Sequence, residues 1–291
     1  MKNNFISPAI SIVIFVSFFL LLSLMEYFFP LRKKEHSLKS RLAINFTLSL
    51  FSFLIAFFVI VPVVKKSLGF TSKEDFGLLY IFRLSPILKG IIAFLLLDLS
   101  IFYWHLLNHK IPFLWRFHNV HHIDPDLDAS TAFRFHFGEM AMSAVFRMIQ
   151  ITTIGVNMVP YLIYEVCFDA NTIFQHSNIR LPIKFERILN KLIVTPRMHG
   201  IHHSQVENET NSNFSTVIPW WDWLHNTIRL NIPQKDIVIG VPAYSKEDDN
   251  NFWQVLFLPF KKQRDYWKRE DGAFPLIKNK DSYNERFKLS E

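Results

Sequence analysis

Apolar residues along this chain gather in long uninterrupted runs. The first run spans Pro8–Phe29 and has Glu26 as its single charge, while the second, Ala43–Val64, carries no charge. A third run, Pro86–Leu107, contains one acidic residue, Asp98. Each run has about the twenty residues that a helix needs to cross a bilayer. The pattern therefore predicts membrane-spanning helices.

A fourth apolar stretch, Met140–Phe174, is too long for a single crossing. It is interrupted at Gly155, Asn157 and Pro160, which favour a turn. We therefore expect two helical segments that form a hairpin. The whole chain is then predicted to be an all-α polytopic membrane bundle of about three to four spans plus this hairpin. A cytoplasmic helical cap is expected to hold the histidine clusters described below.

The first run could be mistaken for a signal peptide, but it is too long and lacks a small-residue cleavage site. The loop after it is basic, with Arg32, Lys33, Lys34, Lys39 and Arg41. Cytoplasmic loops are enriched in such residues, so this loop is expected in the cytoplasm and the N-terminus outside. A second set of basic residues weakens this signal, because a loop is expected to carry Lys65, Lys66, Lys73 and Arg83. A bacterial inner membrane and an endoplasmic reticulum both fit.

The composition agrees with a membrane protein. Hydrophobic residues make up 50% of the 291 positions, and 31 positions are Phe. The net charge of +7 comes from basic residues that flank apolar runs, which indicates contact with anionic lipid headgroups and not with nucleic acid. The single cysteine, Cys167, excludes an internal disulfide and a thiolate metal cage.

We expect one integral-membrane domain over residues 1–291. Within it, a catalytic core is expected over residues 98–227 and a cytoplasmic C-terminal tail over residues 228–291. The segment Ser204–Ser215 is rich in Asn, Ser and Thr and predicts a loop. The apolar segment Phe252–Phe260 ends before two lysines, which indicates a contact with the membrane interface.

Eight of the twelve histidines lie in three short clusters. These are His105 and His109, then His118, His121 and His122, then His199, His202 and His203. Residues spaced i, i+3 and i+4 share one face of a helix. The pair is therefore expected to grip one ion, and each triplet to present three imidazoles to a common point. A lone histidine is usually a hydrogen-bonded core residue, but three clusters at the ends of apolar helices predict a metal site.

The identity of the metal is narrowed by the ligand set. Imidazole suits zinc, copper, iron and nickel, and eight nitrogens exceed the four that a single zinc needs, whereas a two-metal centre uses them. Iron–sulfur clusters need thiolates, and haem would employ only one or two of these side chains. The His-Glu-x-x-His peptidase motif and the Glu-x-x-His signature of soluble di-iron bundles are both missing from the sequence.

The three clusters, their order and their flanking residues resemble the fatty acid hydroxylase/sterol desaturase superfamily of membrane enzymes. The resemblance covers Asp98–Thr227 and rests on Leu114-Trp-Arg-Phe-His-Asn-Val-His-His122, Thr131-Ala-Phe-Arg-Phe-His136, Phe174-Gln-His176-Ser-Asn178, Thr195-Pro-Arg-Met-His199 and Trp221-Asp222. It implies an enzyme that binds two irons through histidine alone and uses O2. Such an enzyme abstracts hydrogen from an unactivated C–H bond of a lipid, so that the lipid is hydroxylated or desaturated.

The resemblance also implies two further ligands, His176 and His136, although His136 is alternatively a hydrogen-bonding neighbour of the ligands. Polar residues expected around the ligands are Asp98, Glu139, Asn178 and Asp222. Of these, Glu139 follows His136 by three residues and is expected to orient it. Two other histidines are not expected to bind metal, because His36 lies in a basic loop and a structural role is favoured for His225.

Two electrons per turnover must come from outside, because the chain has no Gly-x-Gly-x-x-Gly nucleotide fold. The resemblance implies a cytochrome b5-like or ferredoxin-like donor, with a lipid substrate that enters from the bilayer. Sterol, fatty acyl chain, ceramide, alkylglycerol ether and carotenoid all remain possible substrates. Alternatives to the oxygenase are a zinc-dependent membrane hydrolase, a non-catalytic metal-binding lipid scaffold and, more weakly, a haem-binding electron carrier.

Overall fold

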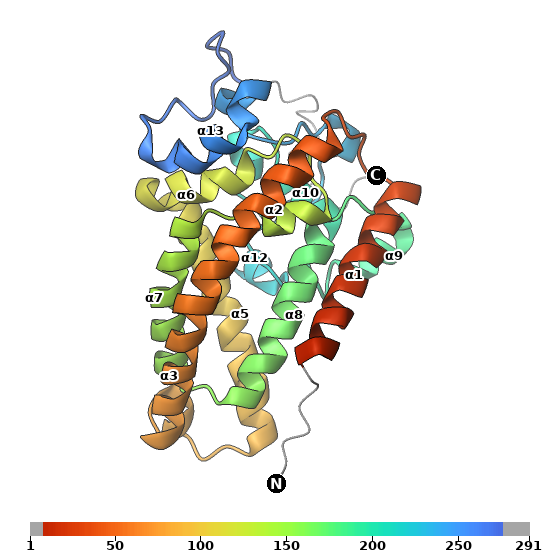
Figure 1. Ribbon diagram of the computed structural model, residues 1–291. Coiled ribbons are helices and arrows are strands. Elements are labelled where there is room, and N and C mark those ends of the chain that lie inside the picture. Colours follow the sequence, from red (N-terminus) through yellow and green to blue (C-terminus); the bar gives the residue numbers. More distant parts are fainter. Residues whose placement is uncertain (1–7, 276–291) are drawn as a thin grey trace.

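The computed structural model describes the backbone of residues 8–275 and the side chains of residues 13–275. Six longer helices run alongside one another: α1 (Pro8–Phe28), α2 (Leu38–Ile55), α3 (Val61–Lys73), α5 (Pro86–Lys110), α7 (Phe137–Ile154) and α8 (Met158–His176) (Figure 1). The expected position of the N-terminus outside the membrane and the end of the predicted tail concern residues that lie outside the described ones.

The all-helical prediction is confirmed for residues 8–275, where two isolated β-bridges form but no β-strand. Two helical stretches, Leu38–Ile81 and Pro86–Lys110, are long and apolar enough to cross a membrane. The described part of α1 adds a shorter apolar segment, Val13–Phe28. The chain is therefore a helical bundle with two candidate membrane spans, and the larger number of spans stays a prediction.

The second apolar run differs from the expectation at its end. A π-helical turn, Ala56–Ile60, joins α2 directly to α3, so the helix continues to Lys73. Lys65 and Lys66 are therefore exposed residues of a helix and not residues of a loop. A lysine ends an apolar run in the sequence without ending a helix, because its stem lies along the surface while its ammonium reaches water.

The predicted hairpin is present as the pair α7 and α8. Helix α7 ends at Ile154, and Gly155 closes it in the left-handed region with φ of 78°. This turn packs against Gly77, which lies between α3 and α5, so closely that a Cβ on Gly77 would lie 2.4 Å from Cα of Gly155. The turn between α7 and α8 is thus in backbone contact with the connection between α3 and α5.

Shorter helices form a cap across the opposite end of the bundle (Figure 1). They are α6 (Pro112–His122), α9 (Ile183–Leu189), α10 (Pro196–His202), α11 (Glu207–Thr210) and α13 (Phe252–Phe257). Of the other short helices, α12 (Trp220–Leu224) lies further down the bundle against α5, and α4 (Leu78–Ile81) lies between α3 and α5. Trp115 and Val120 of α6 share a buried cluster with Val241, Tyr244 and Val255. Residues 228–260 are therefore packed into the cap and do not form a free tail.

The basic loop after α1 is bound to the cap by ion pairs. The guanidinium of Arg41 donates to Asp124 at 2.6 and 2.9 Å and to Asp128 at 2.6 Å. Lys34 pairs with Asp128 at 3.0 Å. Buried Arg32 donates from Nη1 to the side-chain oxygen of Gln234 at 2.5 Å. Arg32, Lys34 and Arg41, whose charge predicted a cytoplasmic loop, therefore also hold this part of the chain to the cap.

Candidate metal centre

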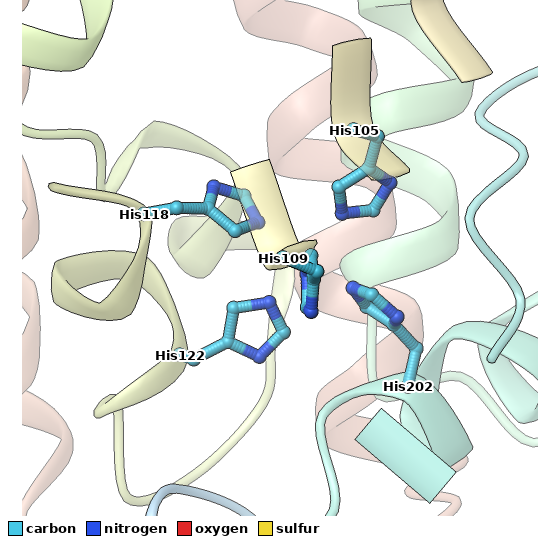
Figure 2. A group of neighbouring side chains, drawn as sticks. All are labelled: His105, His109, His118, His122 and His202. Carbon is cyan, nitrogen blue, oxygen red and sulfur yellow. The ribbon is translucent and has the colours of Figure 1, made fainter. Parts of the chain in front are cut away.

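Nine histidines converge in two neighbouring groups at the capped end of the bundle. The five-histidine group comprises His105, His109, His118, His122 and His202 (Figure 2), and the four-histidine group comprises His121, His176, His199 and His203. Within each group, one ring nitrogen per residue lies within 4.8 Å of all the others. The rings of His122 and His203 stack across the two groups with centroids 4.4 Å apart.

The sequence suggested that each histidine triplet presents its three rings to one common point, and this prediction is wrong. His118 and His122 join the five-histidine group, whereas His121 belongs to the other. Likewise His199 and His203 point to the four-histidine group and His202 to the five-histidine group. The reason is helical geometry, since residues i and i+4 share a face while adjacent residues lie about 100° apart. Helices α6 and α10 thus each supply both groups.

Backbone carbonyls fix the orientation of several imidazoles. Nδ1 of His105 donates to the carbonyl of Phe214 at 2.8 Å, and Nδ1 of His202 donates to that of Ser212 at 2.7 Å. A proton held on Nδ1 leaves Nε2 with a free lone pair, which is the form that binds a metal.

A carboxylate plays the same role for His118, whose Nδ1 donates to Oε1 of Glu139 at 3.0 Å. Nε2 of His118, His122 and His202 is buried and has no hydrogen-bond partner among the described residues. A buried nitrogen without a partner is costly unless something absent from the protein chain occupies it. These orphaned lone pairs therefore fit a bound metal ion.

Ring nitrogens of the four-histidine group lie unusually close together. Nε2 of His176 is 3.0 Å from Nε2 of His121 and 2.9 Å from that of His199, and His203 and His199 are separated by 3.1 Å. With metal–nitrogen bonds of about 2.0–2.1 Å, ligands at right angles are separated by about 3.0 Å and tetrahedral ligands by about 3.4 Å. The spacing matches right-angled coordination.

Burial keeps the imidazoles of the third cluster, His199, His202 and His203, neutral at physiological pH. It lowers the pKa of His202 to about 3, and it lowers the pKa of His199 and His203 well below the usual value, with nearby histidines adding to the effect. Neutral imidazole is the metal-binding form.

The structure leaves three histidines outside both groups: His36 in the loop after α1, His136 and His225. His136 accepts a hydrogen bond from the backbone N–H of Gly138 at Nδ1 and donates from Nε2 to the carbonyl of Leu256. His225 donates from Nδ1 to Trp221 and accepts from the hydroxyl of Tyr103 at Nε2. Neither ring has a free lone pair, so the geometry offers no support for the predicted ligand role of His136.

Two of the expected neighbours of the ligands have different partners. Glu139 contacts His118 and not His136, which it was expected to orient. Asp98 contacts no histidine; its carboxylate accepts from Trp221 Nε1 at 2.8 Å and from the backbone of Ile218 at 3.0 Å. Asp98 thus fastens α12 and the segment just before it to α5.

The other two expected neighbours also hold loops. Asp222 accepts from the backbone N–H groups of Phe214 and Ser215, both at 2.8 Å, and so positions the carbonyl that His105 uses. The side chain of Asn178 exchanges hydrogen bonds with the backbone of Arg32 at 2.8 and 2.9 Å. It therefore ties the end of α8 to the loop after α1.

Both histidine groups border one cavity of about 490 Å³ inside the helical bundle. Its wall is mainly apolar and aromatic, and it reaches ring atoms of both groups through His105, His118, His121, His176 and His199. Sequence reasoning did not single out Arg147 and Asp169, which also line it. Both could have been found in the sequence as charged residues inside the apolar stretch Met140–Phe174, because ionisable residues within membrane segments are usually functional.

Comparison with known proteins gives a consistent result. A family model described as fatty acid hydroxylase matches residues 90–227. Human (Homo sapiens) cholesterol 25-hydroxylase is 30% identical over 138 residues, covering 46% of this chain and 49% of that protein. An ornithine lipid hydroxylase of Rhizobium tropici is 26% identical over 137 residues, which are 47% and 40% of the two chains.

Alkylglycerol monooxygenase of Danio rerio is 27% identical over 187 residues, which cover 62% of this chain and 38% of that protein. The matches thus span about half the length of these curated relatives or less. No solved structure matches the chain.

Proposed function

Because this chain belongs to the fatty acid hydroxylase/sterol desaturase superfamily, we propose that it is an O2-dependent membrane oxidoreductase that hydroxylates or desaturates a C–H bond of a lipid. The observation that carries the proposal is the pair of histidine groups bordering one apolar cavity. A metal centre next to an apolar cavity suits oxidation of a substrate without polar groups at the reacting carbon.

We propose that each histidine group holds one iron, which supplies O2 activation when bound. The right-angled spacing of the four-histidine group supports an ion of higher coordination number over tetrahedral zinc. The Nδ1 hydrogen bonds of His105, His118 and His202 hold the rings in the metal-binding tautomer before any ion arrives.

The cavity has the complementary task of positioning the lipid and excluding water. Its aromatic wall includes Trp104, Phe135 and Phe146, so a bound acyl chain or ring system would pack against them and displace solvent from beside the histidines. The substrate is expected to enter from the bilayer between the helices.

Exposed apolar side chains support a membrane location for the hairpin as well. Val145 and Ile149 of α7 and Ile163 and Val166 of α8 all face outward. Such a surface is favourable in lipid and unfavourable in water. We propose that the capped end lies on the cytoplasmic side, where a cytochrome b5-like or ferredoxin-like protein delivers the electrons.

The test is metal content of the detergent-purified chain, measured by mass spectrometry, for the native protein and for one variant per group, His109→Ala and His176→Ala. The proposal predicts about two irons per native chain. Each variant should lose the iron of the group in which its histidine lies. It also predicts lipid-dependent oxygen uptake with a reductant, which both variants lose.

Other outcomes identify the alternatives. One zinc per chain with activity in the absence of O2 and reductant would indicate a membrane hydrolase. Bound metal without turnover on any lipid would indicate a scaffold. A Soret band in the visible spectrum would indicate a haem carrier.

A further inference from the structure

Two polar stripes run down the cavity away from the histidines. On α8, Asp169 and Thr172 lie on the same face as His176, being seven and four residues before it. On α7, Ser143 and Arg147 follow Glu139 at intervals of four. All six residues line the cavity, and the Asp169 side chain is exposed there.

The single basic residue of these stripes is already neutralised. Nη1 of Arg147 contacts Oε1 of Glu165 at 2.5 Å and donates to the hydroxyl of Tyr161 at 2.8 Å. Asp169, by contrast, lines the cavity without a hydrogen bond to any residue that the structure describes, although Arg147 attracts its carboxylate and Glu165 repels it. A carboxylate in an apolar helix is costly without a partner. Glu165 and Asp169 therefore share the single positive charge of Arg147, and Glu165 takes its hydrogen bond.

Other polar atoms on the wall also lack partners. Oγ1 of Thr172, one turn from Asp169, is buried and has no hydrogen bond within the described part of the chain. The same holds for Oε1 of Gln175, a side chain that is only 2% exposed. Asp169 and Gln175 Oε1 can only accept, since a carboxylate and an amide oxygen have no proton to give. What the wall lacks is a hydrogen-bond donor.

We propose that the cavity binds a lipid through a polar group that donates a hydrogen bond to Asp169, a hydroxyl or an ammonium. Thr172 supplies a second contact to the same group. The inference rests on the proposed function in taking the histidines as the place of oxidation. Asp169 precedes His176 by seven residues, or about 10 Å along the helix. The oxidised carbon is therefore remote from the polar group of the lipid.

The test is lipid binding to the purified full-length chain without reductant, so that no turnover occurs. The probes are radiolabelled hexadecan-1-ol, hexadecylamine and 1-methoxyhexadecane, which share one chain length while only the ether lacks a donor. We expect the native protein to bind the alcohol or the amine about tenfold more tightly than the ether, as one hydrogen bond to a charged group provides.

Variants connect this preference to Asp169. Asp169→Leu is expected to bind all three probes with similar affinity, and the isosteric Asp169→Asn to weaken binding of the preferred donor probe. Val166→Ala, on the outward face of the same helix, should keep the native preference. A preference for the amine identifies an ammonium ligand, and a preference for the alcohol identifies a hydroxyl. The proposal is overturned if the native protein binds the ether equally well or if Asp169→Leu keeps the preference.

This readout is independent of catalysis. If no lipid is ever oxidised but the donor preference depends on Asp169, the proposed function fails and the binding site stands. If lipids are oxidised and the preference is missing, the binding site alone is wrong.

Discussion

At the scale of single residues, the hydrogen bonds of the second ring nitrogen separate metal-facing histidines from structural ones. His118 and His202 bond to the protein through Nδ1 only, so Nε2 is free. His136 and His225 use both nitrogens. The distinction is a property of the folded chain, because it depends on carbonyls and carboxylates that are distant in sequence.

This difference predicts opposite outcomes for two substitutions. His136→Gln should keep the native metal content but lower stability by about 1 kcal/mol, because His136 caps the first turn of α7 through Gly138. His176→Ala should lose the metal of its own group. Metal analysis combined with thermal denaturation in detergent checks both. Loss of metal from His136→Gln would show that His136 is a ligand after all.

A pH dependence follows from the buried histidines of the cap. Burial holds the pKa of His202 at about 3 in the folded state, below the usual 6.5. The unfolded chain therefore takes up a proton that the native chain refuses as pH falls below 6.5. Stability is complete above that pH and is lost progressively toward pH 3, at up to about 1.4 kcal/mol per pH unit for each such histidine.

The measurement is the thermal midpoint of metal-free protein between about pH 7.5 and pH 5, where it should fall. His202→Ala should flatten this slope, while His36→Ala, which alters an exposed histidine, should leave it unchanged. An equal slope in native protein and His202→Ala would show that His202 is not responsible.

Sequence reasoning identified eight of the nine converging histidines from their i, i+3 and i+4 spacing, and the family resemblance implied the ninth, His176. It assigned the triplets to common points, however, and the helix sends neighbours such as His121 and His122 to different groups. Which carbonyl or carboxylate each ring uses was not predictable, as with Glu139, whose partner His118 is twenty-one residues away.

At the scale of secondary-structure elements, the contact between Gly77 and Gly155 holds the hairpin turn. Gly155 has φ of 78°, and a Cβ there would lie 2.8 Å from the carbonyl of Phe76. Gly155→Ala should therefore lose about 1–2 kcal/mol for the left-handed conformation and about 1–3 kcal/mol more for overpacking. Thermal unfolding in detergent measures the loss.

Gly90→Ala is the matched control, because nothing lies within 4 Å of a Cβ at this position of α5. Alanine favours a helix over glycine, so this variant should be equal to the native protein or more stable by up to about 1 kcal/mol. Similar losses in both variants would mean that the turn has no special role.

Helix positions followed closely from the sequence where apolar runs had clear ends. The first, third and fourth runs match α1, α5 and the α7–α8 pair within a few residues. The second run was ended too early because Lys65 and Lys66 were taken as the start of a loop. The cap helices were not predicted in detail, since short helices are stabilised by tertiary contacts more than by local sequence.

At the scale of the whole molecule, buried ion pairs connect the first two helices to the histidine cap. Arg41 of α2 binds both Asp124 and Asp128 in the loop that follows α6. Burial opposes ionisation of Asp124, but Arg41 and Arg134 outweigh it and lower its pKa. The loop after the second cluster therefore depends on a residue eighty or so positions earlier, a connection that no local pattern shows.

Arg41→Met should be strongly destabilising, because it removes the guanidinium that both buried carboxylates share and leaves only Lys34 beside Asp128 and Arg134 beside Asp124. The expected loss is about 3–5 kcal/mol, measured as a drop in the thermal midpoint. Lys39→Met removes an exposed positive charge from the same helix and should have little effect. An unchanged midpoint for Arg41→Met would show that the ion pairs contribute nothing net.

The sharing of α6 and α10 between the two histidine groups has a thermodynamic consequence. Each of these short helices supplies histidines to both groups, so if each group holds one ion, as proposed, the first ion to bind would restrict the motion of both helices. The second ion then meets ligands whose conformational entropy has already been lost, and it binds more tightly. By linkage, each ion raises the affinity for the other by the same factor. Metal loading should therefore be cooperative, and chains that hold one ion should be scarce at every metal concentration.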